Sequence, residues 1–271
     1  MEPGPLWAPV SFTIELCVTD DTIRDNLRAT LDRGYKPFTP WLFSQSGTVS
    51  VVGSGPSLKE TYPDLRGDVM ACNGALGFLL DRGIVPRFAF FMDADERMKK
   101  FVRRHPDVTY LVASRCHPTV FQALEGLDVV VWHAKSEELC DAILAEHGVI
   151  EPLVHGGSAA VTRAMCVAHS MGYREQHLFG ADSSCVDGET HVQKSLAEEK
   201  YLPILAGGRV FTTTAWMAAQ VEDFKVLAPA LEAEGAKFEV HGDGLLPHVA
   251  KIMKAVRHSN SLEVTNELAC V

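Results

Sequence analysis

From residue 48 onward, short apolar runs alternate with segments in which apolar residues recur every three or four positions. The apolar runs are residues 49–52, 69–72, 88–92, 109–113, 128–132, 177–179 and 237–240. The helical patterns between them are residues 75–82, 95–104, 118–125, 136–147, 157–171 and 214–234. Continuous apolar strands that alternate with helices are typical of a parallel sheet buried on both faces. The pattern therefore predicts an α/β fold, an open Rossmann-like parallel sheet with helices on both faces, over residues 48–258.

The first 47 residues do not follow this alternation and are predicted to form an N-terminal helical appendage with a linker. Ile23, Leu27 and Leu31 recur every four residues, after a Thr-Asp pair at 19–20 that can cap a helix. Prolines break the segment that follows, and its aromatic side chains are expected to lie against the domain. Residues 259–271 are polar and are expected to form a flexible tail.

The composition is that of a globular protein with a negative net charge. Of the 271 residues, 46% are hydrophobic, which is enough for a large core. The chain has 25 Lys and Arg against 35 Asp and Glu, so a general nucleic-acid surface is not expected. No stretch approaches the roughly 20 apolar residues of a membrane span, and the first residues lack the pattern of a secretory signal. A cytoplasmic location is therefore expected.

The cysteines and histidines show no metal or disulfide pattern in the sequence. The seven cysteines are scattered and include no Cys-x-x-Cys pair, so we expect reduced thiols that are mostly small buried hydrophobes. None of the 11 histidines is paired at His-x-x-x-His spacing, so the sequence contains no zinc motif.

The loops that follow the predicted strands carry most of the candidate chemistry. In open parallel sheets, ligands bind beyond the carboxyl ends of the strands. The loops selected by this rule are residues 53–57, 73–75, 93–95, 114–117, 133–136, 180–191 and 241–245. They are rich in glycine, serine, histidine and carboxylates, so the sequence predicts a ligand site at this edge of the sheet.

The first of these loops, with the sequence GSGPSL at residues 53–58, has two interpretations. Glycine tolerates positive φ and proline suits a first helical turn, so the loop can be a tight strand-to-helix turn. Glycines also let a phosphate approach the backbone, and a helix N-terminus attracts anions. The loop matches neither the P-loop nor the G-x-G-x-x-G pattern. The residues predicted to bind a nucleotide here are Gly53, Ser54, Gly55, Pro56, Ser57 and Leu58.

The loops after the second and third strands offer a metal site. Asp93 and Asp95 lie two residues apart, so both carboxylates can face one way and hold Mg²⁺. Asp95 can instead cap the helix that follows it. Asn73 and Gly74 form either a turn that opens a helix or a contact to the nucleotide.

The later loops supply the candidate catalytic residues. Gly157 and Ser158 open a helix of small residues, so they can bind the nucleotide or let the helix pack closely on the sheet. Asp182 ends an apolar strand and is predicted to position the ribose or the acceptor. His191 is the predicted general base, because a neutral imidazole accepts a proton near pH 7. Gly242 is predicted to line the nucleotide site. The alternative bases are His117, His133, His155 and His241.

Four segments of the chain, in this order, resemble the MptE-like superfamily. They are VVGSGPSLKE (51–60), DVMACNGALGFLLDRGIVPRFAFFMDAD (68–95), HGGSAAVTRAMCVAHSMGYREQHLFGADSS (155–184) and VHGDGLL (240–246). The superfamily includes archaeal 6-hydroxymethylpterin diphosphokinases and motility-associated flagellin glycosyltransferases. The segments are also similar to those of small bacterial sialyltransferases.

The resemblance implies a nucleotide whose phosphates lie on residues 53–58, with Asn73 and Gly157–Ser158 nearby. In the sialyltransferase-like branch a histidine after the strand that ends in G-x-D serves as the base, and His191 lies in the comparable region, although its flanking residues differ. The diphosphokinase branch requires Mg²⁺, which Asp93 and Asp95 can bind.

The leading prediction is a transferase that moves a sugar from a nucleotide-sugar donor to an acceptor that the sequence does not identify. A diphosphokinase that uses Mg-ATP is the alternative, and a nucleotide-binding protein without catalysis is the second alternative. The first loop lacks the lysine of P-loop kinases, which weakens the ATP interpretation, whereas the Asp-x-Asp pair favours a metal. Residues 192–224 match neither branch and are expected to form the acceptor side.

Overall fold

The computed structural model of the protein describes residues 18–40, 45–135, 138–186, 188–192 and 200–268. At its centre is a sheet of parallel strands in the order β1-β6-β5-β4-β3-β2-β8-β11, with β7 beside β6. The strands are β1 (Lys36–Pro37), β2 (Thr48–Val52), β3 (Asp68–Cys72), β4 (Phe88–Phe91), β5 (Thr109–Ala113), β6 (Val129–Ala134), β7 (Leu153–Val154), β8 (Glu175–Phe179) and β11 (Lys237–Val240). The predicted α/β class with a parallel sheet is therefore confirmed.

The strand order determines where the candidate loops meet. From β2 the chain moves outward strand by strand to β6, and it then returns to place β8 on the other side of β2. The direction of winding thus reverses between β2 and β8, the position at which open α/β sheets bind ligands. The loops that follow these two strands consequently lie side by side.

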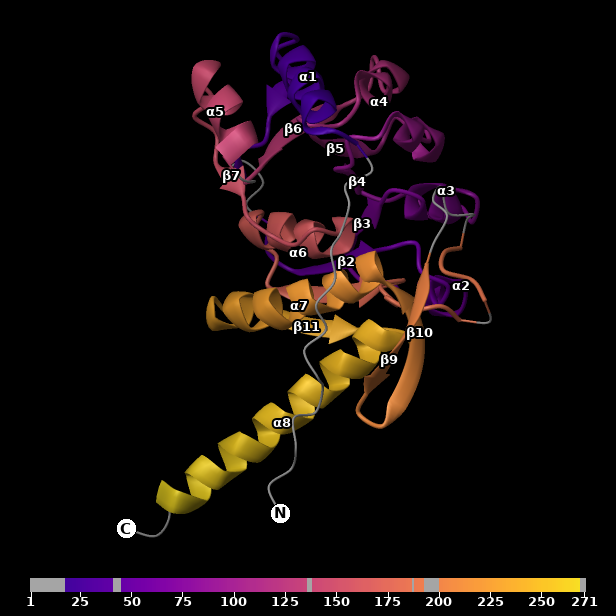
Figure 1. The fold of residues 1–271 in the computed structure, drawn as a ribbon, viewed down its shortest axis with the longest axis vertical. Helices are drawn as coiled ribbons and strands as arrows, with labels where there is room; N and C mark the ends of the chain where they lie inside the picture. Colours follow the sequence, from indigo (N-terminus) through magenta and orange to yellow (C-terminus); the bar gives the residue numbers. More distant parts are fainter. Residues whose placement is uncertain (1–17, 41–44, 136–137, 187, 193–199, 269–271) are drawn as a thin grey trace.

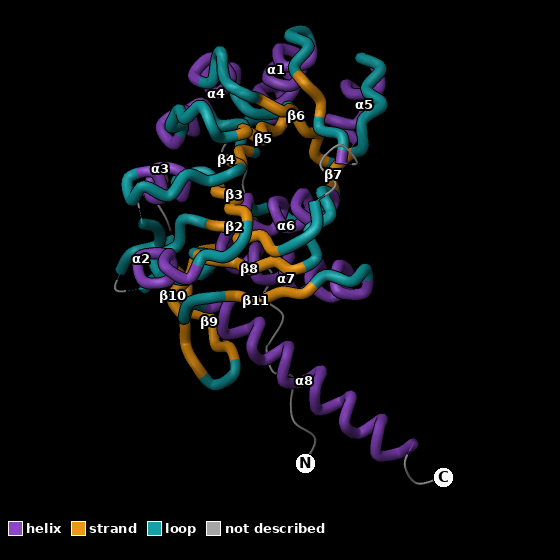
Figure 2. Tube along the Cα trace, turned by 180° about the vertical axis from the view of Figure 1, so that it is seen from behind, coloured by secondary structure: helices purple, strands orange, loops and turns teal. Residues whose placement is uncertain are grey.

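Helices cover both faces of the sheet (Figures 1 and 2). The α-helices are α1 (Asp20–Leu31), α2 (Leu58–Thr61), α3 (Ala75–Leu80), α4 (Pro118–Ala123), α5 (Glu138–Glu146), α6 (Ala160–Ser170), α7 (Ala215–Ala233) and α8 (Leu245–Leu268). Figure 1 shows α6 and α7 on one side of the sheet and α2 and α3 on the other. Two 3-10 helices, η2 (Tyr62–Asp64) and η3 (Glu96–Phe101), complete the connections. The predicted helix at 95–104 is thus a 3-10 helix.

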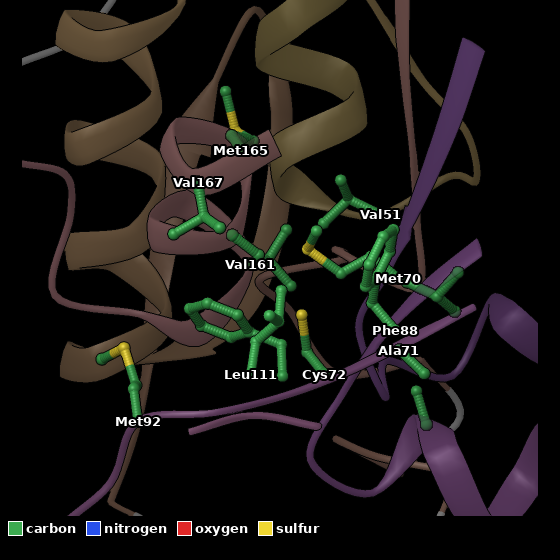
Figure 3. Close-up of a cluster of buried hydrophobic side chains, with 14 of the residues drawn as sticks. Val51, Met70, Ala71, Cys72, Phe88, Met92, Leu111, Val161, Met165 and Val167 are labelled. Carbon is green, nitrogen blue, oxygen red and sulfur yellow. The ribbon is translucent and has the colours of Figure 1, made fainter. Parts of the chain in front are cut away.

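Part of the hydrophobic core lies where α6 packs on the central strands (Figure 3). Val161 and Met165 of α6 are buried, as are Met70, Cys72 and Leu111 of the strands beneath them. Burial of an aliphatic side chain contributes about 1.5–3 kcal/mol. This packing fixes the start of α6 above the carboxyl ends of the central strands.

The N-terminal segment is built into the sheet. Thr19 caps α1 by accepting a hydrogen bond from the Thr22 backbone N–H. Ile23 and Leu27 of the predicted apolar stripe are buried, and α1 packs against α4 and α5. The linker contributes β1, which pairs with β6 at the sheet edge. The predicted appendage therefore extends the domain.

The hairpin of β9 (Tyr201–Ala206) and β10 (Arg209–Thr214) is the main element that the sequence interpretation did not include. It lies within the segment expected to form the acceptor side. At the C-terminus, α8 continues to Leu268, beyond the expected start of the tail. None of the helices in the described part of the chain is both long enough and apolar enough to cross a membrane.

Candidate functional site

The loops after β2 and β8 are joined by backbone hydrogen bonds. The N–H of Gly53 donates to the Phe179 carbonyl and that of Gly55 to the Gly180 carbonyl, both at 2.8 Å. A Cβ atom would lie 2.5 Å from the Gly180 carbonyl oxygen at Gly53, and 2.7 Å from it at Gly55. The close approach of the two loops therefore requires both glycines. Because these two N–H groups are engaged within the protein, a phosphate on this loop would contact its other groups.

Asp182 lies beneath this loop and is 1% exposed. Its Oδ2 accepts a hydrogen bond from the Ser57 backbone N–H at 3.1 Å, at the start of α2. Burial raises the pKa of the Asp182 carboxyl, and the interaction with Ser57 opposes that rise. The carboxylate thus occupies the end of α2 that the sequence interpretation assigned to a phosphate.

The loop after β11 closes over Asp182 from the other side. The Leu246 N–H donates to the Asp182 carbonyl at 3.1 Å, and the Leu245 N–H donates to Ser184 Oγ at 3.0 Å. A Cβ on Gly242 would lie 2.5 Å from Ser57 Oγ. Gly242 therefore adjoins the predicted site because three strand-end loops converge there.

The segment with His191 folds back onto the β2 loop. The Val192 N–H donates to the Ser54 carbonyl at 2.7 Å, and Glu189 forms an ion pair with Lys59 of α2. His191 Nδ1 lies 3.0 Å from Thr190 Oγ1. The structure thus brings the predicted base next to the predicted phosphate loop.

Asp93 and Asp95, the predicted metal ligands, have different hydrogen-bond partners. Asn73 Nδ2 donates to Asp93 Oδ2 at 3.2 Å, and burial raises the pKa of Asp93 while the Arg115 charge lowers it. Asp95 instead caps η3, where its Oδ1 accepts from the Arg97 N–H at 2.8 Å. The hydrogen bond from Arg97 lowers the pKa of Asp95. The capping role that the sequence left open is therefore present, and each aspartate has its own partner.

The turn before α6 is also held by a carboxylate. The backbone N–H and the Oγ of Ser158 both donate to Asp223 Oδ2 of α7, each at 2.7 Å. A Cβ on Gly157 would lie 2.5 Å from the same oxygen. Arg163 of α6 is buried, and its Nε donates to the Gly157 carbonyl at 3.1 Å. Burial lowers the pKa of Arg163.

Asp223 and Arg163 are site residues that the sequence interpretation missed. Asp223 lies inside a helical pattern with no motif to mark it, and Arg163 lies within the segment 155–184 but outside the strand-end loops. Arg163 is held near the strand ends by α6, whose first residue Ala160 has its carbonyl 3.9 Å from Cys72 Sγ at the end of β3. Asp223 is held there by its hydrogen bonds to Ser158.

The other candidate bases lie in different surroundings. His133 Nδ1 lies 2.9 Å from Ser114 Oγ, and burial lowers the pKa of His133. His133 borders a cavity at β6 whose wall includes His147 and Glu151. His117 caps α4. His241 stacks on Phe179, at 4.1 Å between ring centroids and an interplanar angle of 3°.

These features define an open α/β protein whose candidate site lies at the carboxyl edge of the sheet, where the winding reverses. Residues 22–188, well over half of the chain, match the family model described as 6-hydroxymethylpterin diphosphokinase MptE-like. The protein belongs to the MptE-like family, and the resemblance seen in the sequence is confirmed.

One solved structure shows the same fold. The Maf glycosyltransferase from Magnetospirillum magneticum AMB-1 is 19% identical, with a TM-score of 0.58, over 84% of this chain and 38% of that one. The chain therefore spans less than half the length of that enzyme. A mammalian sialyltransferase is 13% identical, with a TM-score of 0.41, over 84% of this chain and 87% of that one. A search of curated protein sequences gives no match.

Proposed function

We propose that the protein is a glycosyltransferase that moves a sugar from a nucleotide-activated donor to a hydroxyl acceptor. Family membership supports a transferase, and the fold shared with the Maf glycosyltransferase is compatible with sugar transfer. The observation that carries the proposal is a set of buried polar atoms at the carboxyl edge of the sheet. Among the described residues, Asn73 Oδ1 and Ser183 Oγ there have no hydrogen-bond partner, and Ser57 Oγ and Asp182 Oδ1 have none outside the Asp182–Ser57 pair.

Buried polar atoms are nearly always hydrogen-bonded in folded proteins, so a group of unpaired ones calls for a ligand or water. Asn73 and Ser183 also have positive φ angles, 48° and 52°, which non-glycine residues rarely adopt. Strained backbone of this kind is concentrated at functional sites. The donor nucleotide would therefore lie between the ends of β2, β3 and β8, with the start of α6 above it.

His191 is the proposed general base for the acceptor hydroxyl. Its segment is hydrogen-bonded to Ser54 of the β2 loop, which would place the imidazole beside the donor. Asp182 would act mainly by keeping the site in shape. Its carboxylate accepts a hydrogen bond from the Ser57 N–H, and its carbonyl accepts one from the start of α8. The acceptor side would include the β9–β10 hairpin.

Nucleotide binding is the first test. A thermal-shift screen with CMP, UDP, GDP and ATP, each with and without Mg²⁺, should show one preferred nucleotide. A ligand at a hundred times its Kd stabilises the protein by about 2.7 kcal/mol. Stabilisation by a nucleoside mono- or diphosphate, followed by transfer from the matching nucleotide sugar, supports the proposal. The absence of stabilisation by any of the nucleotides would contradict it.

The alternative is diphosphate transfer from Mg-ATP, which the description of the family favours. Asp93 would then bind the metal, with Asn73 beside it. In that case ATP should bind only with Mg²⁺, Asp93→Asn should remove the metal dependence, and turnover should release AMP. A protein that binds nucleotide and turns over neither kind of donor would fit the binding-only alternative.

A further inference from the structure

Two adjacent strands each carry a Glu-x-His sequence. On β8 the pair is Glu175 and His177, and on β11 and the residue after it the pair is Glu239 and His241. Glu239 is in register with His177 in the parallel pairing. Paired residues of neighbouring strands point to the same face of a sheet, so the four side chains share one face. It is the face opposite α6, because Gln176 points the other way and donates to the Met165 carbonyl of that helix.

The ligand atoms of three of these side chains converge. His177 Nδ1 lies 3.0 Å from His241 Nε2 and 3.6 Å from Glu239 Oε2. His241 Nε2 lies 4.0 Å from Glu239 Oε1. Tetrahedral zinc with bonds of about 2.0–2.1 Å separates its ligand atoms by about 3.3 Å. The observed separations, measured to two different oxygens of Glu239, range from 3.0 to 4.0 Å around that value.

The surroundings prepare both imidazoles to act as ligands. The other ring nitrogen of His177, Nε2, lies 3.4 Å from Glu175 Oε1. A carboxylate on the second nitrogen fixes the tautomer and the orientation of a metal-bound histidine. Phe179 stacks on the His241 ring.

With both imidazoles neutral, hydrogen bonding within the protein does not satisfy this cluster. If Nε2 of His177 donates its proton to Glu175, Nδ1 carries a lone pair. Nε2 of His241 can donate one proton to that lone pair, but no proton is left between Nδ1 and the Glu239 carboxylate. Two electron-rich atoms then face each other across 3.6 Å. A cation bound by the two ring nitrogens and the Glu239 carboxylate removes this conflict.

We propose that His177, Glu239 and His241 bind a divalent cation of the zinc type, which fastens the edge strand β11 to β8. His177 supplies a buried ligand at 3% side-chain exposure, and Glu239 supplies an accessible one at 58%. The exposed side leaves room for a water as the fourth ligand. Because Gly242 follows His241 and contacts Ser57, the ion also fixes the loop after β11 against the candidate site. The proposal does not depend on glycosyl transfer.

The test is a titration of the metal-free protein with Co²⁺, followed by absorption spectroscopy, and with Zn²⁺, followed by calorimetry. One equivalent of either ion should bind per chain, with the visible bands of tetrahedral Co²⁺ bound by nitrogen and oxygen. Glu239→Gln should weaken binding at least about tenfold, and His241→Ala should abolish it. Zn²⁺ should raise the Tm by about 5 °C in the parent and not in His241→Ala.

His105→Ala is the matched control, because His105 and Asp107 form another histidine–carboxylate pair, 3.9 Å apart, beside β5. That variant should bind the metal as the parent does. Since Glu239 is exposed, Glu239→Gln should fold normally, which keeps the test valid if His241→Ala unfolds. The proposal is overturned by the absence of stoichiometric binding, by unchanged affinity in Glu239→Gln, or by a thiolate-to-cobalt charge-transfer band.

Discussion

The two glycine-rich turns at the carboxyl edge, residues 53–57 and 157–158, look alike in the sequence and are held differently in the structure. The first is joined to the β8 loop by backbone hydrogen bonds, and its aspartate, Asp182, is 1% exposed. The second is held by the side chain of Asp223, and its Ser158 is exposed. The first turn is therefore held by backbone contacts to the neighbouring loop, whereas the second is held by one side chain.

The difference suggests where a donor phosphate would bind. In the first turn the anion position at the start of α2 is filled by a buried carboxylate. In the second turn, at the start of the eleven-residue helix α6, the Ser158 N–H donates to the carboxylate of Asp223, which solvent can reach. A phosphate can displace Asp223 at little structural cost, and helix N-termini favour anions. We therefore expect the second turn to bind the phosphate and the first to support the site.

The largest expected effect is that of Gly55→Val on stability. The new side chain would meet the Gly180 carbonyl, 2.7 Å from the Cβ position, and backbone there cannot move aside. We expect a loss of about 3 kcal/mol or more in the free energy of unfolding, measured with urea. Gly157→Ala meets only the ends of the Asp223 and Thr162 side chains, so it should cost about 1 kcal/mol.

Gly208→Ala is a control for backbone strain alone, because Gly208 has a φ of +81° and open space around it. It should cost about 1 kcal/mol. If the Gly55→Val variant is as stable as the parent, the β2 and β8 loops do not pack as described.

His191→Ala should reduce turnover about a hundredfold and leave the nucleotide affinity nearly unchanged, because a general base acts in the transition state. The measurement is kcat and Kd with the donor identified by the binding screen. His117→Ala is the comparison, since His117 caps α4 and should leave kcat unchanged. Normal turnover of His191→Ala would assign the base to another residue.

Asp223→Asn should act on binding and not on catalysis. Without the competing charge, a phosphate should bind the α6 turn about five- to tenfold more tightly, which corresponds to about 1 kcal/mol. The Kd of the preferred nucleotide is the readout, and kcat should stay within about twofold. Weaker binding in the variant would show that Asp223 contacts the ligand directly.

Asp182→Asn should flatten part of the pH dependence of stability. Because burial raises the pKa of Asp182, its contribution is greatest below the unfolded pKa of about 3.9 and is lost as pH rises through the folded pKa. The asparagine resembles the protonated form, so the variant should lack this decline. Urea unfolding at several pH values from 4 upward measures the difference.

Asp243→Asn is a control at a carboxyl group whose pKa is shifted in the opposite direction. Arg209 lowers the pKa of Asp243 at the surface, so this pair contributes stability that is lost as pH falls. The effect should be smaller, because exposed ion pairs are worth little. The same slope in Asp182→Asn and in the parent would contradict the role of burial.

The alternation of strands and helices from β2 to β8 was predictable because it depends on local periodicity. Strands buried on both faces show as apolar runs, and the stripe of α1 shows in Ile23 and Leu27. The β9–β10 hairpin could also have been predicted from the sequence. Gly207-Gly208 lies between two runs of strand-forming residues, which is a recognised hairpin signal. Its omission reflects a missed turn pattern.

The partners of the site residues depend on contacts between distant parts of the chain. Asp182 meets Ser57 across 125 positions, Asp223 meets Ser158 across 65, and His177 meets His241 across 64. No local pattern encodes these pairs, because they arise when β8 inserts beside β2 and β11 adds to the edge. The sequence identified strand-end residues that can do chemistry, and the strand order selected which of them meet.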